Sequence, residues 1–116
     1  MRYTFRKNER LKSEKQIEAL FLKGQRATAF PLRMVYMKNP AEQQTTQIAI
    51  SVPKKNFKKA VVRNRIKRQI REAYRLEKPL LANNSGVFAL LFLYISKQEE
   101  DYAKIRHAMG ELLKKL

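Results

Sequence analysis

The sequence predicts a single-domain α+β fold, in which one β-sheet packs against helices. Its 116 residues match the usual length of one domain, and 44% of them are hydrophobic, which is enough for a modest core. Two segments alternate apolar and polar residues with the period of two that strands show, and a third is apolar on both faces. Apolar residues recur at helical spacing around these segments, which gives the order helix, strand, strand, helix, strand, helix.

The first part of the chain is predicted to be a basic arm followed by a helix. Residues 1–12 are rich in Lys and Arg, which indicates an extended arm. Ser13 and Gln16 fit the capping box that starts a helix, and Gly24 is a typical helix stop. The apolar stripe between them consists of Ile17, Leu20 and Phe21.

Three strands and a last helix are predicted in the rest of the chain. Residues 30–38 alternate, with Leu32, Met34 and Tyr36 on one side and Arg33, Val35 and Met37 on the other. Residues 47–52 alternate again and end at Pro53, so we expect these two strands to pair as a hairpin. Residues 87–95 are apolar on both faces, as in a central strand that lies parallel to a neighbour. A final helix is expected from about residue 99.

The helix predicted from about Phe57 to Glu77 combines a core-facing stripe with a strongly basic face. The stripe consists of Val62, Ile66, Ile70 and Ala73. The opposite face gathers Asn64, Lys67, Arg68, Arg71 and Arg75. Like charges four residues apart mildly destabilise a helix, so we expect this face to meet a polyanion. The planar fork of arginine suits phosphate groups.

Four lysines crowd the expected start of this helix, where the helix macrodipole is positive. They are Lys54, Lys55, Lys58 and Lys59. Their charge opposes helix stability, but together with free backbone N–H groups it favours a bound phosphate.

Aromatic residues near positive charge are the next candidates, because unpaired bases stack on such rings. They are Tyr3, Phe5, Phe21, Phe30 and Tyr36. Phe21 is the best candidate, since its helix also carries Lys15 and Lys23.

The composition narrows the class of partner. A net charge of +16 predicts a polyanion, and RNA fits best. The absence of cysteine excludes disulfides and Cys-bound zinc, and the longest apolar run falls far short of the roughly 20 residues that span a bilayer. A helix-turn-helix DNA-binding domain would need a second helix just before the basic one, where residues 47–52 predict a strand. We therefore expect a cytoplasmic protein that binds neither membrane nor DNA.

Catalytic machinery is not evident in the sequence. The only histidine, His107, lies near the chain end among basic residues. Glu99, Glu100 and Asp101 cluster where a helix is expected to begin, and acidic residues favour that position without any catalytic role. No pair of carboxylates has the spacing of a metal site, and three glycines in all leave no glycine-rich phosphate loop. We predict no catalytic and no metal-binding residue.

Residues 60–75, AVVRNRIKRQIREAYR, resemble the signature of the protein subunit of bacterial ribonuclease P. The matching elements are Arg63-Asn64-Arg65, Ile66-Lys67-Arg68, Arg71 and the preceding Ser51-Val52-Pro53-Lys54-Lys55. The resemblance extends to the length, the basic arm and the first helix. It implies a single RNA-binding domain over residues 1–116, an α–β sandwich of a four-stranded sheet and three helices with a left-handed βαβ crossover.

The resemblance also implies a function and partners. The protein subunit binds the catalytic RNA of ribonuclease P and the single-stranded 5′ leader of precursor tRNA. The RNA, with Mg²⁺ that it mainly binds itself, cleaves off the leader, so catalysis does not lie with the protein. We expect a monomeric protein in a 1:1 complex with the RNA. The alternative is a non-enzymatic ribosomal scaffold protein, which the composition alone would favour.

Two sets of residues follow from the resemblance by position. Those that match the motif docking on the catalytic RNA are Arg63, Asn64, Arg65, Lys67 and Arg68. Those that match the leader-binding cleft are Ile17, Phe21, Val35 or Tyr36, Lys54, Lys55 and Arg71. Many members have two aromatic residues on the first helix, whereas this chain has Ile17 and Phe21 there, so one stacking ring is lost. The sequence leaves the choice between Val35 and Tyr36 open.

Overall fold

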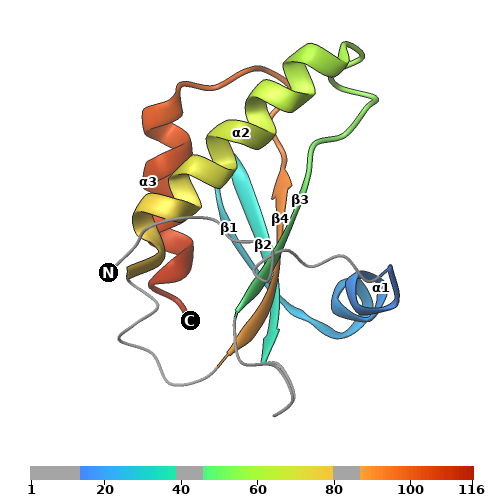
Figure 1. The fold of residues 1–116 in the computed structure, drawn as a ribbon, viewed down its shortest axis with the longest axis vertical. Coiled ribbons are helices and arrows are strands. Elements are labelled where there is room, and N and C mark those ends of the chain that lie inside the picture. The colour runs from blue at the N-terminus through green and yellow to red at the C-terminus, as the bar shows by residue number, and fades with distance from the viewer. Residues whose placement is uncertain (1–13, 39–45, 80–86) are drawn as a thin grey trace.

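The computed structural model describes residues 14–38, 46–79 and 87–116 and forms one α–β sandwich (Figure 1). The elements, in chain order, are α1 (Glu14–Lys23), β1 (Gln25–Ala29), β2 (Leu32–Lys38), β3 (Gln47–Ser51), α2 (Ala60–Glu77), β4 (Phe88–Tyr94) and α3 (Tyr102–Leu113). The predicted α+β class, with three helices and a four-stranded mixed sheet, is confirmed. The predicted arm and the Ser13 cap lie outside the described residues.

The sheet has the strand order β1-β2-β4-β3. The predicted hairpin between residues 30–38 and 47–52 is wrong, because β4 lies between β2 and β3. β4 pairs antiparallel with β2 and, as predicted, parallel with a neighbour, which is β3. The alternation of a strand identifies its two faces but does not identify its partner.

Strand β1 was not predicted. Its sequence, QRATA, has two polar residues, two alanines and a threonine and therefore no apolar alternation. It pairs antiparallel with β2 across the turn at Phe30 and Pro31, so β2 begins at Leu32 rather than at Phe30. The short turn places β1 directly beside β2, so pairing with β2 forms this strand although its side chains show no strand pattern.

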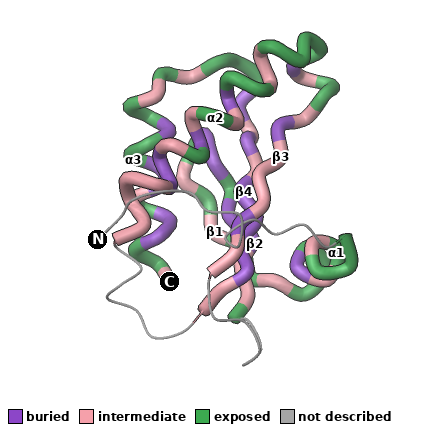
Figure 2. The backbone as a smooth tube through the Cα atoms, in the orientation of Figure 1, coloured by how far each residue is buried: buried purple, intermediate pink, exposed green. Residues whose placement is uncertain are grey.

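The main core lies between the sheet and the layer of α2 and α3 (Figure 2). The predicted stripe of α2 is confirmed, with Ile66, Ile70 and Ala73 fully buried. Each buried isoleucine contributes about 1.5–3 kcal/mol relative to an exposed one. The even-numbered residues of β2 and β4, such as Met34 and Phe92, face this layer.

Among the described elements, α1 alone covers the other face of the sheet. Leu20 packs there against Val35, Ala89 and Leu91, a much smaller cluster. The predicted stop at Gly24 is confirmed, because α1 ends at Lys23 and the Gly24 N–H donates to the Leu20 carbonyl at 2.8 Å.

Helices α2 and α3 both begin later in the chain than predicted. α2 starts at Ala60 instead of Phe57, because Phe57 is buried against Tyr94 with ring centroids 5.7 Å apart. α3 starts at Tyr102 instead of Glu99. In the described part of the chain, no helix has the length and apolar character needed to cross a membrane.

Candidate nucleic-acid interface

Helix α2 turns a row of polar and cationic side chains away from the core. These residues are Asn64, Lys67, Arg68 and Arg71, the open face of α2. Asn64, Arg68 and Arg71 are exposed and Lys67 is half-buried. Among the described residues, none of the three cations has an acidic partner. The open face can therefore attract a polyanion without first breaking an ion pair.

Arg63, the first residue of the motif, supports the entrance to α2. Its guanidinium donates to the carbonyl of Phe57 at 2.8 Å and to that of Lys58 at 3.0 Å. These bonds satisfy carbonyls that the turn before α2 leaves without helical partners. Arg63 thus fixes the turn beside the open face, although it was predicted as an RNA contact.

Arg65 is held by Glu99, which lies in the loop between β4 and α3. Its Nε and Nη2 donate to the two carboxylate oxygens at 2.9 and 2.7 Å. This hydrogen bonding lowers the pKa of Glu99 and raises the pKa of Arg65. The side chains remain 48% and 39% exposed, so a phosphate from solvent can compete with the carboxylate for Arg65.

The loop that carries Glu99 is braced by hydrogen bonds on both sides of it. The buried Tyr94 hydroxyl donates to the Gln98 carbonyl at 2.6 Å and accepts from the Glu100 N–H at 2.8 Å. Ser96 donates to the Glu100 carboxylate at 2.6 Å, which lowers the pKa of Glu100. Glu99 therefore faces Arg65 from a fixed position.

The side of α2 toward α3 is neutralised by ion pairs. Glu72 binds Arg75 within α2, and Glu77 accepts from Arg106 of α3 at 2.9 Å. Hydrogen bonding to Arg75 lowers the pKa of Glu72. Arg75 lies one helical turn after Arg71 on the predicted basic face, and its charge is compensated there by Glu72.

Four exposed lysines lie between β3 and α2. Lys54 and Lys55 form the turn after β3, and Lys58 and Lys59 lie in the extended segment before the helix. Lys59 is the N-cap residue, its side chain makes no capping bond, and the first turn of α2 has no acidic residue. The positive end of the helix dipole is therefore reinforced by side-chain charge, as an anion-binding helix start requires.

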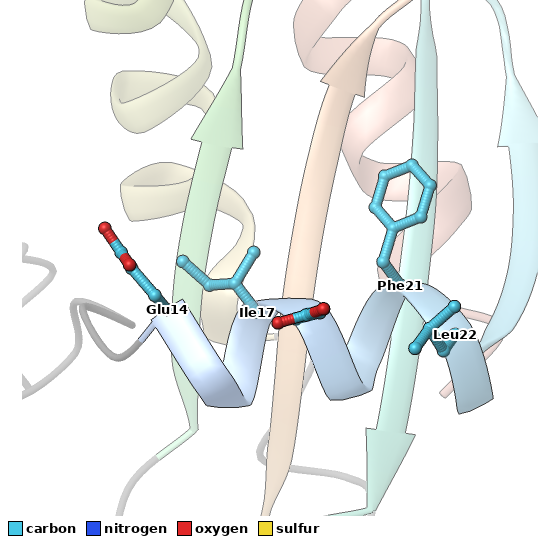
Figure 3. A pocket seen from close by; sticks show the side chains of 5 residues that line it. Glu14, Ile17, Phe21 and Leu22 are labelled. Carbon is cyan, nitrogen blue, oxygen red and sulfur yellow. The ribbon is translucent and has the colours of Figure 1, made fainter.

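Ile17 and Phe21 rise from the same side of α1 in front of the sheet (Figure 3). They line a hollow of about 320 Å³ together with Glu14, Glu18 and Leu22. Phe21 is 45% exposed, and the Arg26 guanidinium lies 5.5 Å from its ring centroid. Arg26 also donates to the Phe21 carbonyl at 3.0 Å. An exposed ring with an adjacent cation is the arrangement that stacks an unpaired base.

A row of side chains crosses all four strands on the same side of the sheet. The row, read from β1 to β3, is Thr28, Arg33, Leu93 and Ser51. Arg33 shares a face with Val35, two residues on, so the row lies on the α1 side. Thr28 and Arg33 are exposed, and Arg33 Nε donates to Thr28 Oγ1 at 3.3 Å. Together with Ile17, Phe21 and Arg26, this row forms what we call the α1 surface.

Arg26, Thr28, Leu93 and Ser51 were not among the predicted site residues, and neither was Arg33. The alternation of residues 30–38 does place Arg33 on the side of Val35, so a signal for Arg33 existed. Arg26 lies in the strand that the sequence did not reveal.

The two candidates on β2 lie on opposite sides of the sheet. Val35 faces α1 and is fully buried, next to Gly24 and Leu20. Tyr36 packs against the main core on the other side. Neither residue adds an exposed ring to the α1 surface. Arg71, also predicted for the leader cleft, is exposed on α2, in the layer on the far side of the sheet from α1.

Groups suited to catalysis or to metal binding do not gather in the described part of the chain. No three His, Cys, Asp or Glu side chains lie close enough there to hold a metal ion. His107 is exposed on α3, and the acidic Glu99 and Glu100 are engaged by Arg65, Ser96 and Lys104.

The fold and these surfaces define a small, basic α–β sandwich protein with two cationic surfaces. Comparison with known proteins identifies the family within this class. The ribonuclease P family matches residues 5–116. The chain is 36% identical to the ribonuclease P protein component of Porphyromonas gingivalis, over 92% of this chain and 82% of that protein. It is 34% identical to the component of Dictyoglomus turgidum, over 97% and 92%.

Solved structures share the fold. The ribonuclease P protein from Thermotoga maritima superposes with a TM-score of 0.77 at 24% identity, covering 93% of this chain and 97% of that one. The protein from Staphylococcus aureus gives 0.76 at 23% identity, over 91% and 93%. The chain belongs to the ribonuclease P protein family, and its function lies in the processing of tRNA 5′ ends.

Proposed function

We propose that this chain is the protein subunit of a ribonuclease P holoenzyme, with separate surfaces for two RNAs. The open face of α2, with Arg65, docks on the catalytic RNA. The α1 surface holds the single-stranded 5′ leader of precursor tRNA. The proposal places the protein in the cytoplasm, as a monomer bound 1:1 to the catalytic RNA.

The unpaired charge of α2 carries the first assignment. Lys67, Arg68 and Arg71 have no acidic partner among the described residues, on a chain of net charge +16. Structured RNA presents a dense array of phosphates, and a rigid helix with repeated cations matches such an array. Lys54 and Lys55 extend this positive charge around the start of α2 toward the Ser51 end of the α1 surface.

The chemistry of the α1 surface supports the second assignment. Phe21 offers a stacking ring, and Arg26 and Arg33 supply charge for the phosphates of a short single strand. Glu14 and Glu18 line the hollow beside Phe21 and repel phosphate. A strand in this hollow would therefore turn its bases toward α1 and its backbone toward the arginines.

Catalysis is assigned in this proposal to the RNA subunit, with Mg²⁺ as the cofactor. The described residues of this chain do not fit a Mg²⁺ site, since no cluster of carboxylates could hold the ion. The contribution of the protein is to bind and orient: α2 fixes the RNA, and the α1 surface selects substrates that carry a leader.

Reconstitution tests this function. Precursor-tRNA cleavage is measured at low Mg²⁺ with the protein alone, a bacterial ribonuclease P RNA alone, and the two together. We expect cleavage at the mature 5′ end to be strong only in the mixture. Cleavage by the protein alone would overturn the assignment of catalysis, and a mixture no faster than the RNA alone would overturn the subunit role.

A further inference from the structure

A second hollow lies at the end of the sheet where β2 ends and β4 begins. Its volume is about 260 Å³, and it is lined by Lys23, Gln25, Tyr36, Met37, Lys38 and Phe88. Neither surface assigned above uses it. Tyr36 was a candidate stacking residue in the sequence, and the structure places it here rather than beside Phe21.

Two aromatic rings in this hollow come from neighbouring strands on one face of the sheet. Phe88 is paired with Lys38, and Tyr36 precedes Lys38 by two residues, so Tyr36 and Phe88 are diagonal neighbours. Diagonal neighbours on adjacent strands are about 7–8 Å apart at the backbone, which is within reach of aromatic side chains, so both rings can contact a single base.

The polar groups of the hollow complete a site for a nucleotide. Lys23 and Lys38 are exposed, and neither has an acidic partner in the described ranges. Gln25, paired with Tyr36 across β1 and β2, offers an amide that can both donate to and accept from a base edge. The N–H of Phe88 donates to Thr46 Oγ1 at 3.2 Å, which fixes the backbone beneath the Phe88 ring.

We propose that this hollow binds one unpaired nucleotide of RNA, with its base against Tyr36 and Phe88 and its phosphate against Lys23 and Lys38. The inference rests on the proposed function, because it needs an RNA already bound by this chain. Two sources share this chemistry: a nucleotide of the leader beyond the part that contacts Phe21, and an unpaired nucleotide of the catalytic RNA.

The experiment uses the holoenzyme and has two arms. The first measures KM for precursor tRNAs whose leaders increase in length. The second measures binding of the protein to the catalytic RNA without substrate. The variants are Lys23→Ala/Lys38→Ala, in which both side chains are exposed, and Phe88→Leu, which removes the ring and keeps apolar bulk. The charge-matched control is Lys97→Ala/Lys115→Ala, with two exposed lysines that line neither hollow. Thermal unfolding confirms that each variant is folded.

We expect Lys23→Ala/Lys38→Ala and Phe88→Leu each to change one of the two measured quantities by about fivefold to tenfold, either as a higher KM for precursor tRNA or as a lower affinity for the catalytic RNA. The other quantity should not change. A loss that appears only with longer leaders identifies the leader as the source. A loss in binding of the catalytic RNA identifies that RNA.

Two results would overturn the nucleotide site. One is that Lys23→Ala/Lys38→Ala gives the same KM and the same affinity for the catalytic RNA as its control. The other is that the double lysine variant binds RNA more weakly while Phe88→Leu does not, because the lysines would then contact only a phosphate. A wild-type protein that fails to stimulate the RNA is a different failure, since it overturns the proposed function itself.

Discussion

The open face of α2 and the α1 surface are both positively charged, but they are built differently. The open face consists of charge and an amide on a rigid helix whose opposite side is anchored in the main core. The α1 surface has an exposed ring, two arginines held by local hydrogen bonds, and a thin helix that covers only part of the sheet. Under the proposed function, this difference assigns the RNA backbone to the first surface and unpaired bases to the second.

The largest expected effect comes from removing the charge of the open face. Lys67→Ala/Arg68→Ala/Arg71→Ala should weaken binding of the catalytic RNA by roughly a hundredfold or more, because a hydrogen bond to a charged group contributes about 1.5–3 kcal/mol. The slope of log affinity against log salt should fall by about two units, at roughly 0.7–0.9 for each phosphate contact. Binding titrations across salt concentrations measure both quantities.

The control for this variant carries the same charge change on α3 and its C-cap residue. Lys104→Ala/Arg106→Ala/Lys114→Ala removes three cations that the structure shows in ion pairs. Equal losses for the two triple variants would show that total charge, rather than the open face, determines the affinity.

The second-largest effect is expected when the packing of α1 against the sheet is disturbed at Gly24. A Cβ on Gly24 would lie 2.5 Å from the Leu20 carbonyl oxygen and 2.8 Å from Val35 Cγ1. Gly24→Ala should lower the free energy of unfolding by about 1–3 kcal/mol and weaken binding of leader-bearing substrate through a displaced α1. Urea denaturation and KM measurements test the two parts.

Gly110→Ala is the matched control for this change. Gly110 lies within α3, and a Cβ there would lie 3.8 Å from the side chain of Glu77 in α2. It should raise the free energy of unfolding by about 0.5–1 kcal/mol, as alanine does in a helix interior. A Gly24→Ala protein as stable as wild type would show that α1 tolerates a shift on the sheet.

A smaller, salt-independent effect is expected at Phe21. Phe21→Ala should raise KM for precursor tRNA with a leader by about tenfold, since stacking on one base contributes about 1–3 kcal/mol. Binding of the catalytic RNA and of a leaderless substrate should not change. Phe30→Ala, which removes another exposed ring that lines neither hollow, is the control. An equal rise of KM for the leaderless substrate would remove Phe21 from leader binding.

The smallest effect is expected from releasing Arg65. Glu99→Gln should tighten binding of the catalytic RNA severalfold at neutral pH, because the carboxylate no longer competes with phosphate. Glu111→Gln, which removes the same charge at the end of α3, is the control.

The pH dependence of this effect has a defined sign. The pKa of Glu99 is lowered in the folded protein, so its pair with Arg65 is intact above the ordinary carboxyl pKa and is lost as the pH falls through the lowered value. The difference between wild type and Glu99→Gln should therefore disappear in acid. Weaker RNA binding by Glu99→Gln at neutral pH would show that Glu99 orients Arg65 for RNA instead of competing.

Local patterns in the sequence predicted the parts of the molecule that depend on one element. The stripe of Ile66, Ile70 and Ala73 and the stop at Gly24 follow from helical spacing and from the backbone of glycine, and the structure confirms both. The open face followed in the same way, as the opposite side of that stripe.

Contacts between distant segments could not be predicted. Arg65 and Glu99 are 34 residues apart, and their pairing depends on how the loop after β4 is braced by Tyr94. The insertion of β4 between β2 and β3 depends in the same way on the assembled sheet. β1 lacks apolar alternation, so the row through Arg33 became visible only once the strands were paired.

The most direct test of the difference between the two surfaces compares salt dependence for two single variants. Affinity for the catalytic RNA and for leader-bearing precursor tRNA is measured across a range of salt concentrations with Arg68→Ala and Phe21→Ala. We predict that Arg68→Ala reduces the slope for the catalytic RNA by about 0.7–0.9. Phe21→Ala should weaken substrate binding at every salt concentration without changing a slope. A change of slope with Phe21→Ala, or none with Arg68→Ala, would contradict the division of labour between the two surfaces.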